Sequence, residues 1–279
     1  MPAPSRVRSR VAARALAPLL ALALGACAIS RSQESQMGEE YARELNAQLA
    51  LVADPEINRY LTVLGDSIAA VSGGQVAAWH FYLVDSRAVN AFAVPGGYIY
   101  VTRGLVERTE AMTELAGVLG HEIAHVVRRH SVEQMERAQR ANVGVTLACV
   151  LTGVCGSEAA QAGIQIGGAA VFARYSRSDE SEADRDAVAT VVRAGIHPRG
   201  IVTMFERLLA ERERSPAALD EWFATHPTEE ARIAEVQKVI ATIDSTVLAT
   251  LGTDTPRYHA FRDRVRALPP SPEADSAGR

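Results

Sequence analysis

The sequence lacks an excess of positive charge and lacks internal repeats, and each absence argues against a class of protein. Its 279 residues include 29 basic and 33 acidic side chains, a formal net charge of −4 at pH 7. Four of the basic residues lie within the first 14 positions. The remainder of the chain has 25 basic and 33 acidic residues and therefore a net charge of −8. This balance offers no basic surface to DNA or RNA, so we expect no nucleic-acid partner. Without a repeat, a helical-repeat array is not expected either.

The sequence has only three cysteines, and none belongs to a C-x-x-C pair of the kind that ligates zinc. Cys149 and Cys155 lie within residues 143–173, where Glu158 is the single charged residue. The two cysteines either form a disulfide, which needs a bend between them, or remain two buried thiols, and both alternatives stay open. The first apolar half of this segment is too short to span a bilayer, so we expect helices packed on the core or touching a lipid surface.

The apolar run near the start of the chain is also too short to cross a membrane. Residues 15–27, ALAPLLALALGAC, fall short of the roughly 20 apolar residues that a spanning helix needs. A cluster of arginines followed by a short apolar run and small residues is typical of a secretory signal. The ending Leu24–Cys27 resembles a bacterial lipobox, whose cysteine receives the lipid. We therefore interpret residues 1–26 as a lipoprotein signal peptide and Cys27 as the lipidated residue; the alternative is an ordinary signal with an incidental cysteine.

The residues after Cys27 predict where the mature protein resides. Neither Ala28 nor Ile29 is an aspartate, which resembles the pattern of outer-membrane lipoproteins. We expect a protein anchored by lipid in the bacterial envelope, facing the periplasm, with residues 27–38 as a polar tether.

Hydrophobic periodicity and turn residues predict a predominantly helical α+β fold. Aromatic and β-branched residues predict one strand at 79–85 and two more within 89–104, joined by a Pro-Gly-Gly turn at residues 95–97. The proline lacks an N–H donor, which places this region at the edge of a small sheet. We expect one domain over residues 39–267 and a disordered tail over 268–279. The predicted helices span residues 39–52, 55–71, 108–140, 178–194, 198–213, 228–243 and 255–267.

The stretch HEIAH, residues 121–125, combines metal-ligand spacing with a potential base. On a helix, residues four apart share one face, so His121 and His125 can bind the same ion. Glu122 stands one residue further round, where it can reach a water on that ion. The pattern also arises by chance, and an amphipathic helix that happens to carry histidines is the alternative. A catalytic zinc takes three protein ligands and one water, so the third ligand has to come from elsewhere in the chain.

The acidic run SRSDESEADRDA, residues 176–187, offers that ligand. Glu180 and Asp184 are four residues apart and share one helix face. Glu180 can bind the metal while Asp184 accepts the outer N–H of a ligand histidine and so fixes its tautomer. Taken alone, the run would read as a solvated acidic helix start; beside the HEIAH helix, the metal site is the better interpretation.

His130 is a tempting additional ligand that the spacing argues against. It lies nine residues beyond His121, about 180° round a continuous helix, and Ser131 stands where a third metzincin histidine would be. We expect His130 on the helix surface, facing away from the metal.

The HEIAH and SRSDESEAD motifs together resemble the HtpX/BepA-like gluzincin zinc metalloendopeptidases, whose signature is H-E-x-x-H followed by E-x-x-x-D. Two further segments extend the resemblance over about residues 35–245: NAFAVPGGYIYVTRGL, from position 90, and THPTEEAR, residues 225–232. The resemblance implies a gluzincin-type domain with one zinc per chain, held by His121, His125 and Glu180. Some members of the family carry a helical-repeat domain, which we do not expect in this chain.

The resemblance also implies roles for the residues around the zinc. Glu122 becomes the base and Asp184 the orienting carboxylate. His226 either stabilises the oxyanion or binds the zinc in a resting state, and Arg232 holds a loop or a carboxylate. The family's edge strand pairs with an extended substrate, which here implies Asn90, Ala91, Phe92 and Ala93.

The function that follows is an envelope-anchored zinc endopeptidase that hydrolyses unfolded or misassembled envelope proteins as quality control. Expected partners are such substrates, the membrane through the lipid, and envelope assembly machinery. One alternative is a non-catalytic assembly factor or holdase that uses the same cleft; another is a metallohydrolase with a non-peptide substrate. Glu122 argues against the holdase, since a pure binder has no use for a base beside the metal.

Replacing Cys27 tests the anchor. We predict that Cys27→Ser moves the protein from the membrane to the soluble fraction, because no other site for the lipid is expected. Fractionation of cells that express either form measures this. Persistent membrane association of the variant would instead implicate residues 143–173.

Overall fold

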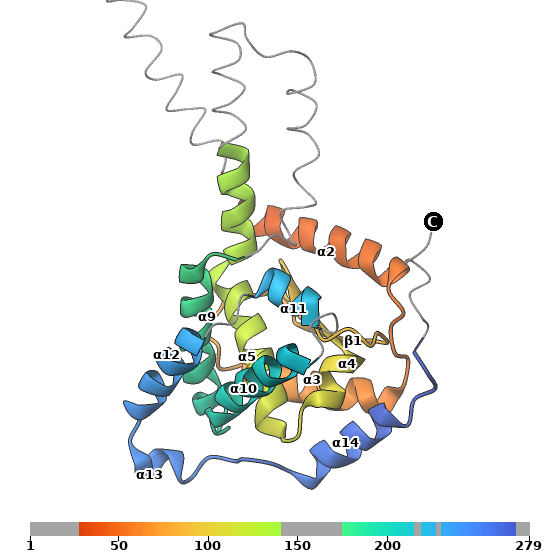
Figure 1. The fold of residues 1–279 in the computed structure, drawn as a ribbon. Helices are drawn as coiled ribbons and strands as arrows, with labels where there is room; N and C mark the ends of the chain where they lie inside the picture. Colours follow the sequence, from red (N-terminus) through yellow and green to blue (C-terminus); the bar gives the residue numbers. More distant parts are fainter. Residues whose placement is uncertain (1–27, 141–174, 215–218, 227–229, 272–279) are drawn as a thin grey trace, which may run out of the picture.

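The computed structural model describes residues 28–140, 175–214, 219–226 and 230–271 (Figure 1). The signal peptide, the lipidation of Cys27, the pairing of Cys149 with Cys155 and the apolar segment 143–173 lie outside the described residues, so these interpretations stay predictions.

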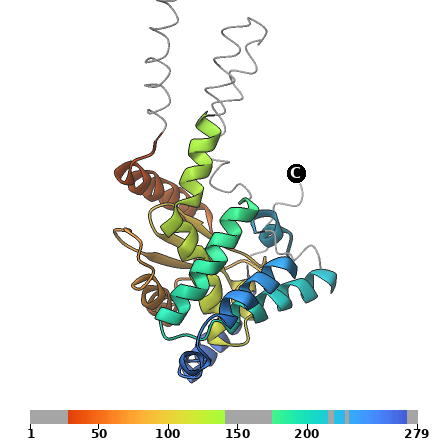
Figure 2. The same cartoon turned by 90° about the vertical axis from the view of Figure 1, so that its left-hand side faces the viewer.

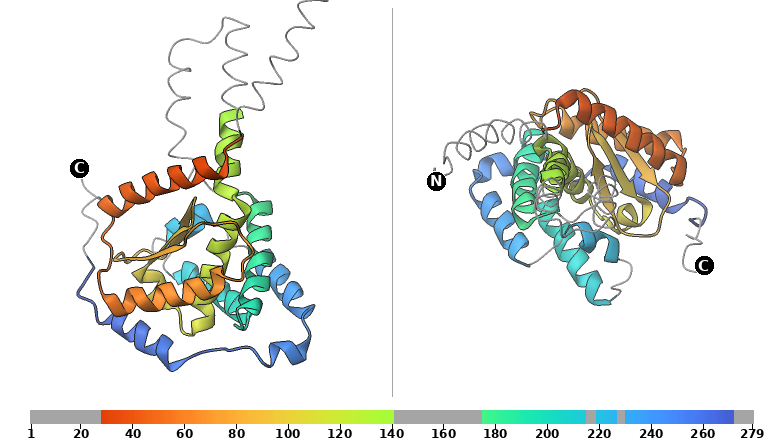
Figure 3. Two further views of the ribbon diagram at one scale, coloured as in Figure 1. Left: turned by 180° about the vertical axis from the view of Figure 1, so that it is seen from behind. Right: turned by 90° about the horizontal axis from the view of Figure 1, so that it is seen from above.

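Helix α5, Met112–Arg128, is the centre of the fold. Every residue from Met112 to Val126 is buried, as expected for a helix with apolar residues on all sides. Three helices pack against it: α3 (Pro55–Ala69), α9 (Arg177–Arg193) and α10 (Arg199–Arg214). Seen from above (Figure 3, right), α5 lies between α9 on one side and the sheet on the other.

Close helix packing around α5 depends on glycines. A Cβ atom at Gly120 would lie 3.1 Å from Val191 on α9, so the small residue lets the two helices approach each other. A Cβ atom at Gly200 on α10 would lie 2.1 Å from the carbonyl oxygen of Thr113. A larger residue would crowd α9 against α5 at Gly120 and would force α10 away from α5 at Gly200.

A three-stranded sheet covers another face of α5. It comprises β1 (His80–Val84), β2 (Ala91–Val94) and β3 (Tyr98–Thr102), in the order β1-β3-β2. Strand β3 pairs in parallel with β1 and antiparallel with β2. Gly96 and Gly97, with φ of 89° and 105°, form the tight turn of the hairpin. The predicted strands and the edge position of the segment before the turn are therefore confirmed.

The first described helix, α2 (Arg31–Gln48), lies across the sheet (Figures 1 and 3). The Ser30 side chain accepts from the Gln33 amide while the Gln33 side chain accepts from the Ser30 amide, a capping box that starts the helix. Glu34, 4% exposed, accepts from Arg129 Nε at 2.6 Å. Residues 31–38 are thus helical and packed on the domain, so the predicted tether is wrong for this segment: its polar residues include a helix cap and a buried ion pair.

The predicted single helix over 108–140 is broken twice. Helix α4 (Arg103–Arg108) ends before α5 begins, and α5 ends at Arg129, whose φ of 62° is left-handed. Residues 130–140 form a new helix that rises from the end of α5 (Figure 2). A left-handed residue turns the chain, so side chains beyond it no longer follow the rotation of α5.

The C-terminal helices are α11 (Asp220–Thr225), α12 (Glu230–Ala241), α13 (Ser245–Leu248) and α14 (Pro256–Arg266). The predicted helices 178–194, 198–213, 228–243 and 255–267 agree with α9, α10, α12 and α14, whereas short α4, α11 and α13 were not predicted. Residues 268–271, predicted as disordered, are held in place: Arg103 donates to the carbonyl oxygens of Leu268 and Pro269. In the described part of the chain, no helix combines the length and apolar character needed to cross a membrane.

We predict that Gly200→Ala lowers the free energy of unfolding by about 1–3 kcal/mol, because the added methyl group forces α10 away from α5. Urea denaturation of the full chain measures this. Gly252→Ala is the matched control: its Cβ would meet only the Gly195 carbonyl, at 3.5 Å, and it should leave stability nearly unchanged. Equal losses in the two variants would contradict the packing argument.

Candidate metal centre

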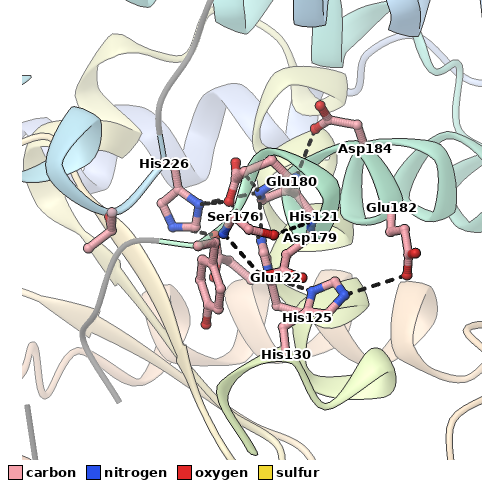
Figure 4. Close-up of polar contacts among 12 residues, drawn as sticks. His121, Glu122, His125, His130, Ser176, Asp179, Glu180, Glu182, Asp184 and His226 are labelled. Atoms are coloured by element: carbon pink, nitrogen blue, oxygen red, sulfur yellow. Dashed lines mark hydrogen bonds and ion pairs between the residues drawn. The ribbon is translucent and has the colours of Figure 1, made fainter. Parts of the chain in front are cut away.

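Helix α5 places its two histidines side by side in the interior (Figure 4). His121 and His125 are each 1% exposed, and their Nε2 atoms lie 3.0 Å apart. The four-residue spacing therefore does what the sequence predicts, since both rings point to the same side of the helix.

Helix α9 brings a carboxylate to these nitrogens. The Ser176 side chain accepts from the Asp179 amide and caps the helix, which begins at Arg177, three residues before Glu180. Glu180 Oε1 then lies 3.4 Å from His125 Nε2, and its Oε2 lies 3.6 Å from His121 Nε2. One face of the acidic run is consequently buried, and Glu180 faces the histidines in the interior instead of solvent.

His226 adds a fourth donor from the end of α11. Its Nδ1 lies 3.2 Å from Glu180 Oε1 and 3.4 Å from His121 Nε2. Its Nε2 lies 3.5 Å from Glu122 Oε1. The ring packs on Trp222, four residues earlier, with centroids 5.0 Å apart. His226 is thus part of the same cluster, although more than 40 residues separate it from Glu180 in the sequence.

The four donors match the size of a metal site. One atom each from His121, His125, Glu180 and His226 lie within 4.8 Å of one another. Ligands about 2.1 Å from a tetrahedral ion are separated by about 3.4 Å. The observed separations of 3.0, 3.2, 3.4 and 3.4 Å are close to that value. The described residues therefore fit a single metal ion.

Burial and neighbouring charges set the protonation states of the ligands. Burial lowers the pKa of His125 well below its ordinary value, which favours the neutral, ligating ring. For His121, burial opposes the charge, but contacts with Asp184 and Glu180 raise the pKa to about 10. Burial opposes ionisation of Glu180 as well, but His226 and the other histidines lower its pKa, so its carboxylate is charged. In the metal-free protein a protonated His121 and Arg232 balance the carboxylates of Glu180 and Asp184, so a metal ion bound by His121 would displace the proton from that ring.

Glu122 is the one carboxylate of the cluster outside the ligand set. It is fully buried, and neither of its carboxylate oxygens has a hydrogen-bond partner among the described residues. Burial raises its pKa. Since buried polar atoms are almost always hydrogen-bonded, these free oxygens mark a group that acts on something bound at the site.

Asp184 and Arg232 support the ligands from behind. Asp184 Oδ1 lies 3.0 Å from the outer nitrogen of His121, Nδ1, although this nitrogen has no well-aligned acceptor among the described residues. Arg232 donates to both Asp184 oxygens, at 2.7 and 2.8 Å, and its Nη1 lies 2.6 Å from Glu180 Oε2. One guanidinium therefore contacts both carboxylates, while the roles predicted for the two residues stay predictions.

The prediction for His130 is wrong. The residue is 2% exposed, and its Nδ1 lies 2.9 Å from Nδ1 of His125. The left-handed conformation of Arg129 ends α5 and redirects the next helix, so the predicted rotation of 180° does not apply.

Tyr175 is a residue of this centre that sequence reasoning missed. Its ring stacks on His125 with centroids 3.9 Å apart, and its hydroxyl lies 2.8 Å from Ser131 Oγ. Tyr175 precedes the cap of α9 by one residue, and no spacing rule singles it out.

The predicted substrate strand lies beside α5. Asn90 and β2 residues Ala91, Phe92 and Ala93 occupy the edge of the sheet. The Thr102 amide donates to the Asn90 carbonyl, and Ala91 pairs with Val101. Because hydrogen-bonded and non-bonded pairs alternate in antiparallel sheets, the backbone groups of Ala91 and Ala93 point away from β3.

The fold and the site together define a gluzincin-type metallopeptidase: an HExxH helix, a second helix that supplies a glutamate, and a small sheet whose edge strand lies beside them. The family model described as peptidase family M48 matches residues 55–240, and the chain belongs to this family. The family resemblance inferred from the sequence motifs is therefore confirmed, as is the predominantly helical α+β fold.

Three relatives illustrate the similarity. The beta-barrel assembly-enhancing protease of Yersinia pestis is 31% identical over 235 residues, which cover 81% of this chain and 47% of that protein. Metalloprotease LoiP of Escherichia coli (strain K12) is 27% identical, over 77% of this chain and 83% of LoiP. Mitochondrial metalloendopeptidase OMA1 of Schizosaccharomyces pombe is 27% identical, over 75% of this chain and 62% of that protein. The chain spans about half the length of the beta-barrel assembly-enhancing proteases it matches.

We predict that Arg232→Met lowers the free energy of unfolding of the metal-free chain by about 3–5 kcal/mol, because it leaves two buried carboxylates without their guanidinium. Urea denaturation in the presence of a chelator measures this. Arg128→Met is the matched control, because Arg128 on α5 forms a surface ion pair with Asp186 on α9. Loss of this pair should lower the free energy of unfolding by under about 1 kcal/mol. A small loss in both variants would contradict the supporting role of Arg232.

Proposed function

We propose that this chain is an envelope-anchored zinc endopeptidase that hydrolyses peptide bonds of unfolded or misassembled envelope proteins. The observation that carries the proposal is Glu122: a buried carboxylate without a hydrogen-bond partner among the described residues, next to four converging metal donors. Family membership and the names of the relatives support peptide hydrolysis as the reaction.

Zinc is the metal that suits these donors best. Two or three imidazole nitrogens and one carboxylate in tetrahedral arrangement are typical of zinc, whereas calcium and magnesium prefer oxygen ligands in larger shells. His121, His125 and Glu180 would hold it. When bound, zinc polarises the scissile carbonyl and lowers the pKa of a water towards about 7.

Glu122 acts as the general base. It takes the proton from the attacking water and later passes that proton to the leaving amine. The pKa of its carboxyl group is raised by burial, and a base whose pKa lies nearer neutrality exchanges protons more efficiently in both directions.

His226 has two possible roles, and the described geometry favours one of them for the resting protein. Catalytic zinc sites keep one position open for water, whereas sites with four protein ligands are closed. The distances of His226 to Glu180 and His121 match those of a fourth ligand, which supports a closed resting state. In the active state His226 would leave that position and could stabilise the oxyanion.

Strand β2 is proposed to bind the substrate. Ala91 and Ala93 are 0% and 5% exposed, so their outward backbone groups would pair with an extended chain only after this edge is uncovered. Such pairing reads the backbone more than the side chains. Such recognition suits unfolded or misassembled proteins, because folded proteins offer few free strands.

The envelope location rests on the lipobox-like sequence before Cys27 and on the relatives. A protein named beta-barrel assembly-enhancing protease covers most of this chain, which supports envelope assembly machinery as a partner. An outer-membrane lipid anchor would place the site in the periplasm, where such substrates arise.

We predict that Glu122→Gln keeps bound zinc but lowers cleavage of an unfolded casein by about 10²–10⁴-fold, because only the base is lost. Zinc content and cleavage are measured on the full chain. Glu180→Ala is predicted to lose both zinc and activity.

Each outcome bears on a different part of the proposal. Stoichiometric zinc in Glu180→Ala would show that the third ligand is wrong. Zinc without cleavage by the parent would favour either a holdase or the closed state. Gain of cleavage by His226→Ala would support the closed state, whereas an inactive variant would fit either a holdase or a His226 that the reaction itself needs.

A further inference from the structure

His130 is a buried titratable residue that the proposed reaction does not use. It belongs to neither the metal ligands nor the substrate strand, yet it is 2% exposed and its Nδ1 lies 2.9 Å from Nδ1 of His125 (Figure 4). This distance is that of a hydrogen bond between two imidazoles. His125 points its other nitrogen, Nε2, at Glu180 and His121.

The metal-facing side of His125 determines how this hydrogen bond is directed. A neutral histidine that ligates through Nε2 keeps its proton on Nδ1. His125 Nδ1 therefore donates, and His130 Nδ1 has to be the acceptor. A neutral His130 then carries its own proton on Nε2.

The Nε2 atom of His130 faces a carboxylate. Glu182 Oε2 lies 3.7 Å away, on α9 between Glu180 and Asp184, and the Glu182 side chain is 39% exposed. The oxygen accepts no direct hydrogen bond at this distance, but it lies on the side towards which the His130 N–H would point. Helix α9 thus places a carboxylate behind each ligand histidine: Asp184 directly behind His121, and Glu182 behind His125 with His130 between them.

The ring of His125 is held on two sides. Tyr175 stacks on its face with an interplanar angle of 22°, and His130 meets its edge. Tyr175 is itself held by Ser131, the neighbour of His130, through their hydroxyl groups. The turn at Arg129 therefore brings His130 to the edge of His125 and Ser131 to the hydroxyl of Tyr175, and both contacts help to orient the His125 ring.

We propose that His130 is a positioning residue for the metal: it accepts the Nδ1 proton of His125, fixes the tautomer that ligates through Nε2, and couples that ligand to Glu182. The proposal rests on the proposed function in so far as His125 ligates zinc. Groups that orient ligand histidines typically contribute 10–100-fold to metal affinity.

Zinc affinity of the full chain tests the proposal, measured by competition with a chromogenic chelator. His130→Leu is expected to bind zinc about 10–100-fold more weakly. His130→Asn is expected to recover most of the affinity, because its amide oxygen can stand where Nδ1 stood and accept the same proton. Glu182→Gln is expected to produce a smaller loss, since its oxygen is distant and half-exposed.

Val132→Ala is the control for a merely structural effect. Val132 is buried in the same helix but packs with Met135, Ile29, Met37 and Tyr41, away from the histidines. This variant should lower the melting temperature and leave zinc affinity unchanged, whereas His130→Leu should change the affinity.

A measurement on the unmodified chain covers the case in which His130→Leu fails to fold. Nitrogen-15 NMR of labelled histidine in the zinc-loaded protein is expected to show the His130 proton on Nε2 and the His125 proton on Nδ1. A His130 proton on Nδ1, or equal zinc affinity in His130→Leu and the parent, would overturn the positioning role. Absence of zinc binding by the parent would instead overturn the proposed function.

Discussion

The packing of α9 against α5 is the contact on which the site depends. Helix α5 carries His121 and His125 but no third ligand, and α9 carries Glu180, which has no reason to be buried without those histidines. Gly120 lets the two backbones approach, because a larger side chain there would meet Val191. A shift of about 1 Å between these helices would break the match between donor separations and a bound ion, so precise apolar packing is a condition of the chemistry.

The second constraint is the charge that this packing buries. Glu180 and Asp184 lie in the interior, where an unpaired carboxylate is expensive. Arg232 binds both, and the histidines supply the remaining donors. These carboxylates also serve the site, because Glu180 faces the metal donors and Asp184 lies behind His121. Glu182, on the same helix, lies further out beside His130.

Spacing within a single helix allowed much of the site to be predicted from the sequence. HEIAH fixes two ligands and a base because helix geometry sets their relation without reference to the rest of the fold, and the strand pattern around the Pro-Gly-Gly turn similarly predicts an edge hairpin. The position of His130 was predicted wrongly, because the rotation was counted on a continuous helix and the left-handed residue Arg129 ends that helix. The start of α2 was also not predicted. Its polar sequence resembles a linker, and the contact of Glu34 with Arg129, 95 positions away, is not visible in the sequence. Spacing placed Glu180 as a candidate, whereas His226 was placed by family resemblance alone, since no local rule links it to the other ligands.

The most direct test of the central claim is anomalous diffraction at the zinc absorption edge from crystals of the zinc-loaded chain. We predict one ion per chain, bonded to Nε2 of His121 and His125 and to the carboxylate of Glu180, with His226 as the fourth ligand in the closed state. An ion bound elsewhere, or a crystal of zinc-treated protein with no ion between α5 and α9, would contradict the account.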